Sequence, residues 1–527
     1  MRQTVKTPAA GGASRAGLET VLFDVDGVVT DTAAAHAVAW KELFDDYLAG
    51  RNADFRPFDP DSDYRTYVDG KPRYDGVRSF LQSRGIDLPF GSESDGPDAE
   101  TICGLGNRKD GFFRRWLDRN EVEAFPGTLA LFEDLKRAGV RIAAFSSSRN
   151  ARTVLRSAGV ADVFDATVDG SDMAGLGLPG KPDPAILFQA AGLLQAEPAR
   201  TAVVEDAVSG VSAGAAGRFV QVIGVDRDGA SEDLERAGAS LVVGDLAELR
   251  LDGSGWLSAR TIASTPSATD ARNHLQTQIA GRRIAVFLDY DGCLTPLVDD
   301  PKDAVLAPGM RAALSRLAER APVAIVSGRD LDDVRGLVDD DSLYFAGSHG
   351  FDLAGPDGWR DGLKQGEAFI GDLEAAADAL EAAIGSIDGA RVERKKFALA
   401  VHFRQASAEG ERQVAEVVRE TMRDFARLRA SPGAKIFDVK PRIDWHKGRA
   451  VLALMERLGL DGPDVAAFYL GDDTTDEDAF RVLSARGFAV VVRGGDDRRT
   501  SARYALDGVG EVEGFLNWLA TQAERTG

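Results

Sequence analysis

The sequence contains Val21-Leu22-Phe23-Asp24-Val25-Asp26-Gly27 and, in its second half, the closely similar Val286-Phe287-Leu288-Asp289-Tyr290-Asp291-Gly292, and this recurrence is the main indication of the fold. Each copy is an apolar run that ends in Asp-x-Asp-Gly, and such a run predicts a buried parallel strand. Side chains two residues apart on a strand point the same way, so both carboxylates face one space at the strand end. Two such carboxylates repel each other, and oxygen-only ligands suit Mg²⁺. A polar turn with capping aspartates is the alternative for a single copy, so the rest of the chain decides.

Length and composition narrow the possible classes of protein. A chain of 527 residues is too long for one core and predicts several structural units. Its net charge of −21 argues against nucleic acid or an anionic membrane as partner, although local Lys and Arg side chains can still bind an anionic substrate. The two cysteines, Cys103 and Cys293, form neither a disulfide framework nor a zinc site, and they suit a reducing compartment. No apolar run is long enough to span a bilayer. Residues 1–17 lack the apolar core of a signal peptide, which predicts a disordered tail and a cytoplasmic protein.

The first half places polar residues at the ends of predicted strands. A helix is predicted after the first Asp-x-Asp, with one apolar face made of Trp40, Leu43, Phe44, Tyr47 and Leu48. The mixed region that follows, to about residue 120, carries basic residues beside glycine turns, among them Arg73 and Lys109, which are either solvated or phosphate-binding. The strand 140–145 then runs into Ser146-Ser147-Ser148-Arg149-Asn150, a natural phosphate cradle before a helix.

Two further elements complete a catalytic order in the first half. Lys181 lies between turn residues, and the strand 202–206 ends in Glu205 and Asp206. Phosphoryl transfer through an aspartyl phosphate requires one Asp to attack phosphorus and a second to handle the proton. It also requires Ser and Lys to hold the phosphoryl oxygens, and acids to hold Mg²⁺. The order Asp-x-Asp, Ser, Lys and acidic pair supplies all of these groups.

The same order restarts in the second half. Residues 252–278 lose the strand–helix rhythm and are rich in Ser, Thr and Gly, which predicts a linker. Beyond it the corresponding residues are Asp289, Asp291, Ser327, Lys447, Asp472 and Asp473. The long insert follows the Asp-x-Asp strand in the first half, whereas in the second half it lies between Ser327 and Lys447. The halves are therefore predicted to share a core and to carry their caps at different places.

The second insert, residues 355–440, predicts an α/β cap. A helix is predicted at about 367–384, and alternating stretches such as 397–404 and 435–441 follow it. His402 and Arg404 share one face of such a stretch, which is either turned to a substrate or an ordinary polar outer face.

Both halves resemble the haloacid dehalogenase-like superfamily, whose fold is a doubly wound parallel sheet with a mobile cap. The first half resembles the β-phosphoglucomutase group in Phe23–Thr32, His36, Trp40-Lys41, residues 146–150, Lys181-Pro182 and Glu205-Asp206. The resemblance implies Asp24 as nucleophile, Asp26 as acid/base, Ser146 and Lys181 at the phosphoryl group, and metal on Asp24, Asp26, Glu205 and Asp206. It also implies that the substrate is bound by Arg73, Lys109, Ser148, Arg149 and Asn150. Arg149 stands where this group has Lys, which favours phosphate binding over mutase activity.

The second half resembles trehalose-6-phosphate phosphatase. The matching motifs are residues 288–296, Ser327-Gly328-Arg329, Ala346–Gly350, Val401–Arg404, Lys440-Pro441, Ile443–Gly448 and Gly471–Phe480. The resemblance implies Asp289 as nucleophile, Asp291 as acid/base, and Ser327 and Lys447 at the phosphoryl group. It implies Mg²⁺ on Asp289, the backbone carbonyl of Asp291, Asp472 and Asp473. The substrate candidates are Arg329, His349, Gly350, Glu393, Lys395, Lys396, His402, Arg404 and Lys440, and the sequence does not separate Lys395 from Lys396.

The sequence therefore predicts an α/β protein with two doubly wound parallel-sheet cores. The first domain is expected at 18–251 with a mainly helical cap at about 32–120, and the second at 279–527 with an α/β cap. The expected activity is Mg²⁺-dependent hydrolysis of trehalose 6-phosphate, with small-molecule sugar phosphates as partners. In the alternatives, the first half senses a sugar phosphate without catalysis or forms a dimerisation arm, or the main substrate is another sugar phosphate. The sequence leaves the oligomeric state open.

Overall fold

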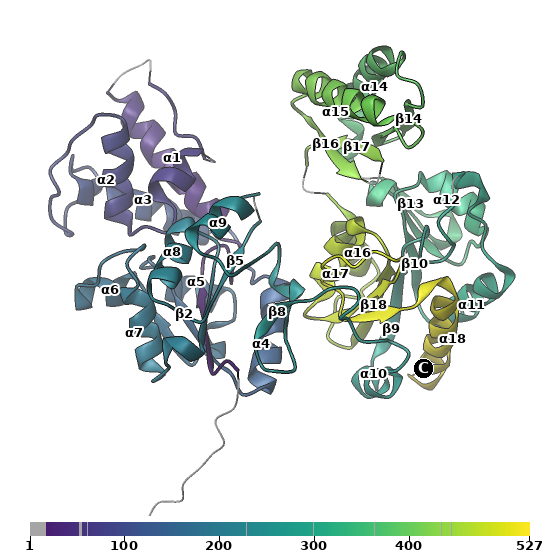
Figure 1. Ribbon diagram of the computed structural model, residues 1–527, viewed down its shortest axis with the longest axis horizontal. Helices are drawn as coiled ribbons and strands as arrows, with labels where there is room; N and C mark the ends of the chain where they lie inside the picture. Colours follow the sequence, from purple (N-terminus) through teal and green to yellow (C-terminus); the bar gives the residue numbers. More distant parts are fainter. Residues whose placement is uncertain are drawn as a thin grey trace, which may run out of the picture. The chain divides into compact units, whose positions relative to one another are not determined.

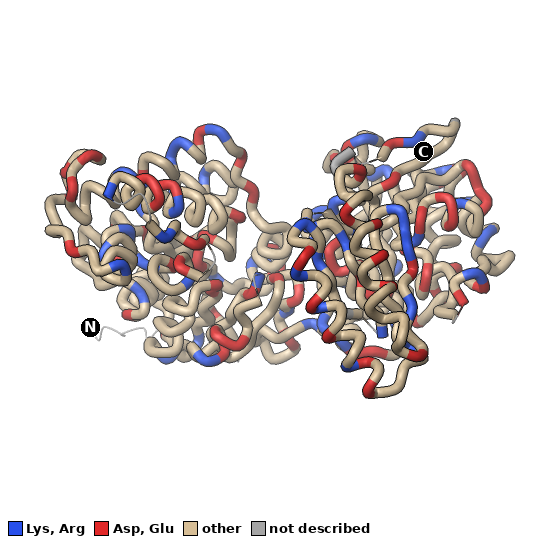
Figure 2. Tube along the Cα trace, turned by 90° about the horizontal axis from the view of Figure 1, so that it is seen from above, with Lys and Arg blue, Asp and Glu red and all other residues tan. Residues whose placement is uncertain are grey.

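The computed structural model describes residues 17–51, 55–60, 62–227, 229–298, 300–362, 364–433, 435–443 and 445–526. The chain divides into two compact units, of which unit 1 ends at Arg260 and unit 2 begins at Thr261. Apart from Gly17, the predicted disordered tail over residues 1–17 lies outside the described residues. No helix in these ranges is both long and apolar enough to cross a membrane. Figure 2 shows acidic and basic positions interspersed along both units.

The core of unit 1 is a parallel six-stranded sheet in the order β3-β2-β1-β4-β5-β6, which confirms the predicted fold class. Its strands are β1 Thr20–Asp24, β2 Arg141–Phe145, β3 Ala166–Val168, β4 Thr201–Glu205, β5 Gln221–Val225 and β6 Leu241–Val243. Alternate residues of β1 face opposite layers, so Val21 and Phe23 pack with the helices α4 Pro126–Arg137 and α5 Ala151–Ser157. Leu22 packs on the other face, with α7 Ala185–Leu193, α8 Val208–Ala216 and α9 Ser231–Ala237. The short helix α6 Gly170–Leu176 follows β3.

The cap of unit 1 is helical and follows β1 directly. It consists of α1 Ala33–Ala49, a π-helical turn Tyr64–Val68, α2 Arg73–Ser83 and α3 Ile102–Leu117, which lie together in Figure 1. The predicted apolar face of α1 is buried and packs with α2 and α3 in a separate hydrophobic cluster. The cap thus has its own core, so it is a distinct body over the sheet.

The core of unit 2 is an eight-stranded sheet in the order β13-β12-β11-β10-β9-β18-β19-β20. Six strands are parallel: β9 Arg283–Leu288, β10 Val323–Val326, β11 Tyr344–Gly347, β18 Val465–Gly471, β19 Gly487–Val492 and β20 Tyr504–Leu506. The edge strands β12 Asp352–Ala354 and β13 Arg360–Gly362 pair antiparallel. One face of the sheet is covered by α10 Arg272–Ile279, α11 Pro308–Ala318, α12 Leu331–Val338 and α18 Gly508–Thr526. The other face is covered by α16 Lys447–Arg457 and α17 Glu477–Leu483.

The cap of unit 2 is an antiparallel sheet with helices on one face. Its strand order is β14-β15-β17-β16, with β14 Arg391–Lys395, β15 Ala398–His402, β16 Leu428–Gly433 and β17 Ile436–Pro441. The helices α14 Ile370–Ile384 and α15 Ala408–Thr421 cover this sheet in Figure 1, and the short helix α13 Lys364–Glu367 precedes them.

The predicted linker over residues 252–278 contains regular structure. The strand β8 Leu257–Ala259 pairs with β7 Leu249–Leu251 in unit 1, while α10 begins at Arg272 in unit 2. Ile262, Ala268 and Leu275 are buried in the cores of unit 2. The Ser and Thr residues of this segment form local hydrogen bonds, since Thr261 is hydrogen-bonded to both Ser264 and Thr265.

Candidate active sites

Each unit places its first Asp at the carboxyl end of the central strand. Asp24 ends β1 between β2 and β4, and Asp289 follows β9 between β10 and β18. Both side chains are buried. Burial raises the pKa of both carboxyl groups well above the ordinary value, so each must be stabilised by a cation to act as a carboxylate.

A buried lysine supplies that cation in unit 1. Lys181 donates to Asp24 over 2.5 Å and also to Glu205. Burial alone would lower the pKa of Lys181, but the two carboxylates outweigh it and raise the pKa. The ammonium group is thus held charged against Asp24, the predicted nucleophile, where a phosphoryl oxygen would also lie.

Unit 2 repeats this arrangement with Lys447. Its Nζ lies 3.0 Å from the Asp289 carboxylate and 2.7 Å from that of Asp476. Tyr469 donates a further hydrogen bond of 2.6 Å to Asp476, which is fully buried. Asp476 was not among the predicted site residues, although it lies in the motif 471–480. A lysine that is buried at the strand end requires a second acid nearby, and this requirement points to Asp476.

The second Asp of each motif has different partners in the two units. Thr32 donates to Asp26 over 2.5 Å, and His36 of the cap lies 3.4 Å from it. Burial would raise the pKa of Asp26, but His36 and Thr32 outweigh it and lower the pKa to about 2. Arg329 instead makes two hydrogen bonds of 2.7 Å to Asp291. Arg329, predicted to bind substrate, is thus paired to the predicted acid/base.

The two serines lie where the sequence predicts them, at the end of the strand beside the nucleophile strand. Ser146 follows β2 and Ser327 follows β10, and both are nearly fully buried. Each hydroxyl accepts a hydrogen bond from the backbone N–H two residues on, at Ser148 and Arg329 respectively. Each hydroxyl can still donate its own hydrogen: that of Ser146 goes to Asp26 over 3.3 Å, and a phosphoryl oxygen at the strand end could accept it instead.

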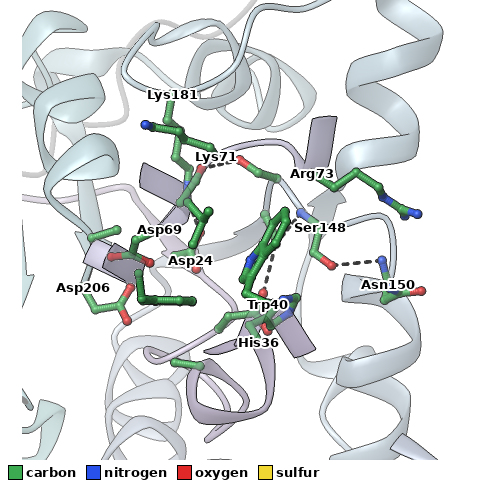
Figure 3. Close-up of a pocket in the computed structure, with 18 of the residues that line it drawn as sticks. Asp24, His36, Trp40, Asp69, Lys71, Arg73, Ser148, Asn150, Lys181 and Asp206 are labelled. Atoms are coloured by element: carbon green, nitrogen blue, oxygen red, sulfur yellow. Dashed lines mark hydrogen bonds and ion pairs between the residues drawn. The ribbon is translucent and has the colours of Figure 1, made fainter. Parts of the chain in front are cut away.

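The cap of unit 1 closes over this strand end (Figure 3). The cavity is lined by core residues and by His36, Trp40, Asp69, Arg73 and Lys109 of the cap. Lys109 Nζ lies 2.6 Å from His36 Nδ1, and burial followed by repulsion from Arg73 lowers the pKa of Lys109 to about 7. The lining residues Tyr64, Asp69 and Asp110 were not predicted, because the helices and loops of a cap give no strand-end signal.

The two lysines that the sequence left unresolved have different neighbours. Lys396 is half exposed and pairs with Asp352 over 2.7 Å. Lys395 instead acts electrostatically on His349 and Lys440. Burial, followed by Lys440, Lys447 and Lys395, holds the pKa of His349 well below the ordinary value, so its imidazole is neutral. Lys395 thus acts through its charge on two predicted site residues, whereas Lys396 pairs with Asp352.

The other predicted substrate residues of unit 2 differ in their surroundings. Glu393 pairs with His402 over 2.7 Å, and both are half-buried. Lys440 lies 3.3 Å from Asp438, Gly350 is buried beside His349, and Arg404 is exposed.

Acidic side chains at the end of β18 could hold a cation. Carboxylate oxygens of Asp289, Asp472 and Asp476 lie within 4.8 Å of one another. Asp472 Oδ1 is buried without a hydrogen-bond partner among the described residues, and burial raises the pKa of Asp472 to about 7. An orphaned carboxylate oxygen among oxygen donors fits Mg²⁺. Asp473 is exposed and caps the helical turn Thr474–Asp476, so its side chain is engaged elsewhere.

Comparison with known proteins follows this division into units. The family model of haloacid dehalogenase-like hydrolases matches residues 18–218, and that of trehalose-phosphatase matches residues 287–509. The chain is 40% identical over 336 residues to the trehalose-phosphate phosphatase of Mycobacterium tuberculosis, a match that covers 63% of this chain and 84% of that protein. The chain belongs to the trehalose-phosphate phosphatase family.

A longer relative and two solved structures also match parts of this chain. The chain is 41% identical to an uncharacterized glycosyl hydrolase of M. tuberculosis over 95% of its own length but only 38% of that protein. It thus spans about two fifths of that relative. The C-terminal domain of trehalose-6-phosphate phosphatase from C. albicans is 24% identical, with a TM-score of 0.43 over 49% of this chain and 99% of that chain. A β-phosphoglucomutase from Clostridium difficile is 26% identical, with a TM-score of 0.36 over 44% and 92%. Both scores are below 0.5, so the assignment to the trehalose-phosphate phosphatase family depends on sequence identity.

Proposed function

We propose that unit 2 hydrolyses trehalose 6-phosphate to trehalose and phosphate. The observation that carries the proposal is the contact of Lys447 with both Asp289 and Asp476 at the end of the central strands, beside Asp472. The 40% identity to a trehalose-phosphate phosphatase supports the choice of substrate.

In this proposal an Asp289 oxygen attacks phosphorus, and the bond from phosphorus to the sugar oxygen breaks. Asp291, protonated and released from its two hydrogen bonds to Arg329, gives its proton to the leaving sugar oxygen. Asp291 then takes a proton from water as the water oxygen attacks the aspartyl phosphate, which releases phosphate and restores both residues. Lys447 and Ser327 stabilise the phosphoryl oxygens.

The residues that would hold Mg²⁺ are Asp289 and Asp472, with the backbone carbonyl of Asp291. The bound ion would neutralise charge on the phosphoryl oxygens. His349, Glu393, Lys395, His402 and Lys440 are proposed to bind the disaccharide. A neutral imidazole and a carboxylate suit hydroxyl groups, since both can accept hydrogen bonds.

The test is phosphate release from trehalose 6-phosphate by the full chain. Asp289→Asn should lower turnover by at least about 10³-fold, as for loss of other catalytic nucleophiles. Asp24→Asn is the matched control in unit 1 and should leave this activity intact. Undiminished turnover in the Asp289→Asn chain would sink the assignment.

For unit 1 we propose phosphoryl transfer on a second sugar phosphate, with Asp24 as nucleophile and Asp26 as acid/base. The cavity that joins these residues to the cap favours this function over a dimerisation arm. An intact contact between Lys181 and Asp24 favours catalysis over sensing, since a sensor needs no nucleophile. Phosphate release from, and isomerisation of, β-glucose 1-phosphate should be measured with the Asp289→Asn chain. Conversion that disappears on adding Asp24→Asn supports catalysis, and no conversion favours the sensor.

A further inference from the structure

The cavity of unit 1 has two chemically different ends. Figure 3 shows Asp24, Asp69 and Asp206 on one side and Arg73, Ser148 and Asn150 on the other. The first side is the reacting end, where Lys181 contacts the nucleophile. The second side, here called the far end, carries the donors Arg73, Ser148, Arg149 and Asn150, which the resemblance to β-phosphoglucomutases assigns to a second phosphate.

A carboxylate of the cap already binds two of these far-end donors. Asp110 Oδ1 accepts a hydrogen bond of 2.7 Å from Asn150 Nδ2 and lies 3.2 Å from Arg73 Nη2. Arg114 binds the other oxygen of Asp110 over 3.0 Å. Arg73 and Asp110 are only 14% and 13% exposed, so the pairing is shielded from water and from salt.

Arg149 repeats this pattern nearer the surface. It pairs over 2.7 Å with Glu93, another cap carboxylate. Glu93 is half exposed, so water and salt weaken this pair more than the pairing of Asp110. Both arginines of the far end are therefore charge-compensated within unit 1.

We propose that Asp110 is a specificity-determining residue of unit 1. Its carboxylate holds Arg73 and Asn150, which a substrate's second anionic group would need, so the cavity accepts a sugar monophosphate and disfavours a bisphosphate. A second phosphate would have to displace Asp110 or lie against it, and like charges at that distance repel strongly in a shielded site.

This inference rests on the proposed function of unit 1 and narrows it. Exchange of phosphate between two positions of a sugar requires a bisphosphate at the site, whereas hydrolysis requires only a monophosphate and water. In the hydrolysis the water oxygen bonds to phosphorus, the bond to Asp24 breaks, and Asp26 takes the water proton. Asp110 therefore favours hydrolysis over exchange.

The test measures ligand binding, so that it does not depend on turnover. Asp110→Asn is introduced into the full chain that carries Asp24→Asn and Asp289→Asn, and calorimetry compares glucose 1,6-bisphosphate with β-glucose 1-phosphate. Removing the charge should tighten binding of the bisphosphate at least about tenfold, the size of one charge-assisted contact. Affinity for the monophosphate should change by less than about threefold. Asp118→Asn, an exposed position at the end of the same helix, is the matched control.

An unchanged or weaker affinity for the bisphosphate in the Asp110→Asn chain would overturn the proposal, because Asp110 would then only orient Arg73. Failure of both chains to bind the bisphosphate overturns it equally. Neither outcome affects turnover of β-glucose 1-phosphate by the Asp289→Asn chain, so the proposed function of unit 1 fails or holds separately. Asp110→Ala, with thermal melting of each chain, guards against a folding defect.

Discussion

The two units hold the predicted active-site lysine with carboxylates from different places in the chain. In unit 1 the partner is Glu205, the last residue of β4, and the residue five positions later is Gly210. In unit 2 the corresponding strand ends at Gly471, and the partner Asp476 comes five positions later. The register supports this correspondence, because Val204 pairs with Phe23 of β1 as Leu470 pairs with Leu288 of β9.

The glycine and the carboxylate have thus exchanged positions. A Cβ on Gly210 would overlap the Glu205 side chain, and a Cβ on Gly471 would overlap the Asp476 side chain. Gly210 leaves room for the Glu205 side chain in unit 1, and Gly471 leaves room for the Asp476 side chain in unit 2. The comparison teaches that a buried lysine fixes where a negative charge lies in space, while two positions of the chain can supply it.

Reversing the exchange is the most disruptive way to test this comparison. Asp476→Gly leaves Lys447 with only one buried partner. It should cost about 3–5 kcal/mol, as for breaking a buried ion pair, and should lower phosphatase turnover at least about 10²-fold. The double variant Gly471→Glu/Asp476→Gly copies unit 1 and should recover part of both. Thermal melting and phosphate release from trehalose 6-phosphate measure these effects. A double variant with no higher stability or turnover than the single variant would contradict the exchange of positions.

A feature that the units share should be nearly as sensitive. Gly27 and Gly292 have φ angles of +80° and +78°, and a Cβ on either would overlap the carboxylate of Asp206 or Asp472. Gly292→Ala should cost about 1–3 kcal/mol of backbone strain and displace Asp472. Turnover of unit 2 should fall about 10²-fold. Gly336→Ala in α12, with open space around its Cα, is the control and should stay active. Equal activity of both variants would contradict the role of Gly292.

The acidic group of unit 2 predicts a pH dependence of Mg²⁺ binding. Burial raises the pKa of Asp472 to about 7 in the folded chain, above its ordinary value, so the folded state favours the proton. Without a cation, this carboxyl lowers stability as pH rises toward 7. Mg²⁺ must displace the proton, so its affinity should fall about tenfold per pH unit below 7. Calorimetry of the full chain carrying Asp24→Asn measures this slope.

Two neighbours in sequence sharpen this prediction. Asp472→Asn should abolish Mg²⁺ binding in unit 2, whereas Asp473→Asn keeps the helix cap and should bind Mg²⁺ normally. Loss of Mg²⁺ binding in the Asp473→Asn chain would instead support Asp473 as a metal ligand, as the sequence suggested.

The smallest effect concerns the paired lysines of the second cap. Lys395→Ala should raise KM for trehalose 6-phosphate about tenfold, because one charge-assisted contact is lost. Lys396→Ala removes a half-exposed ammonium group that pairs with Asp352 and lies over the Phe397 ring, and it should change KM less than about twofold. Steady-state kinetics of the two variants decides this, and a larger effect of Lys396 would reverse the assignment.

The sequence predicted what depends on strand order and missed what depends on cap geometry. The strands that end at Asp24 and before Asp289 are confirmed as β1 and β9, and Ser146 and Ser327 follow the neighbouring strands as predicted. These residues could be predicted from the sequence because parallel strands bring their carboxyl ends to one edge of the sheet. Tyr64, Asp69 and Asp110 line the cavity from helices and loops whose packing over the sheet has no local signal.

The acidic positions after β18 show a second limit. Asp472, Asp473 and Asp476 share one short motif, and spacing alone did not say which faces the lysine. The turn Thr474–Asp476 decides it, because it points Asp476 inward and leaves Asp473 as an exposed cap. The resemblance to trehalose-phosphatases gave the motif, whereas burial assigned its members.

The connection between the units has a practical consequence for studying the two candidate sites separately. Arg260 is hydrogen-bonded to Glu248 in unit 1, and Ile262, only two residues later, is hydrogen-bonded to Arg498 in unit 2. The two units are therefore joined without a stretch of spare residues between Arg260 and Ile262. A fragment that ends at residue 255 loses the buried Leu257, and one that begins at residue 279 loses the buried Ile262, Ala268 and Leu275. Each would expose apolar surface and tend to aggregate. Fragments should be separated at the single peptide bond between residues 260 and 261.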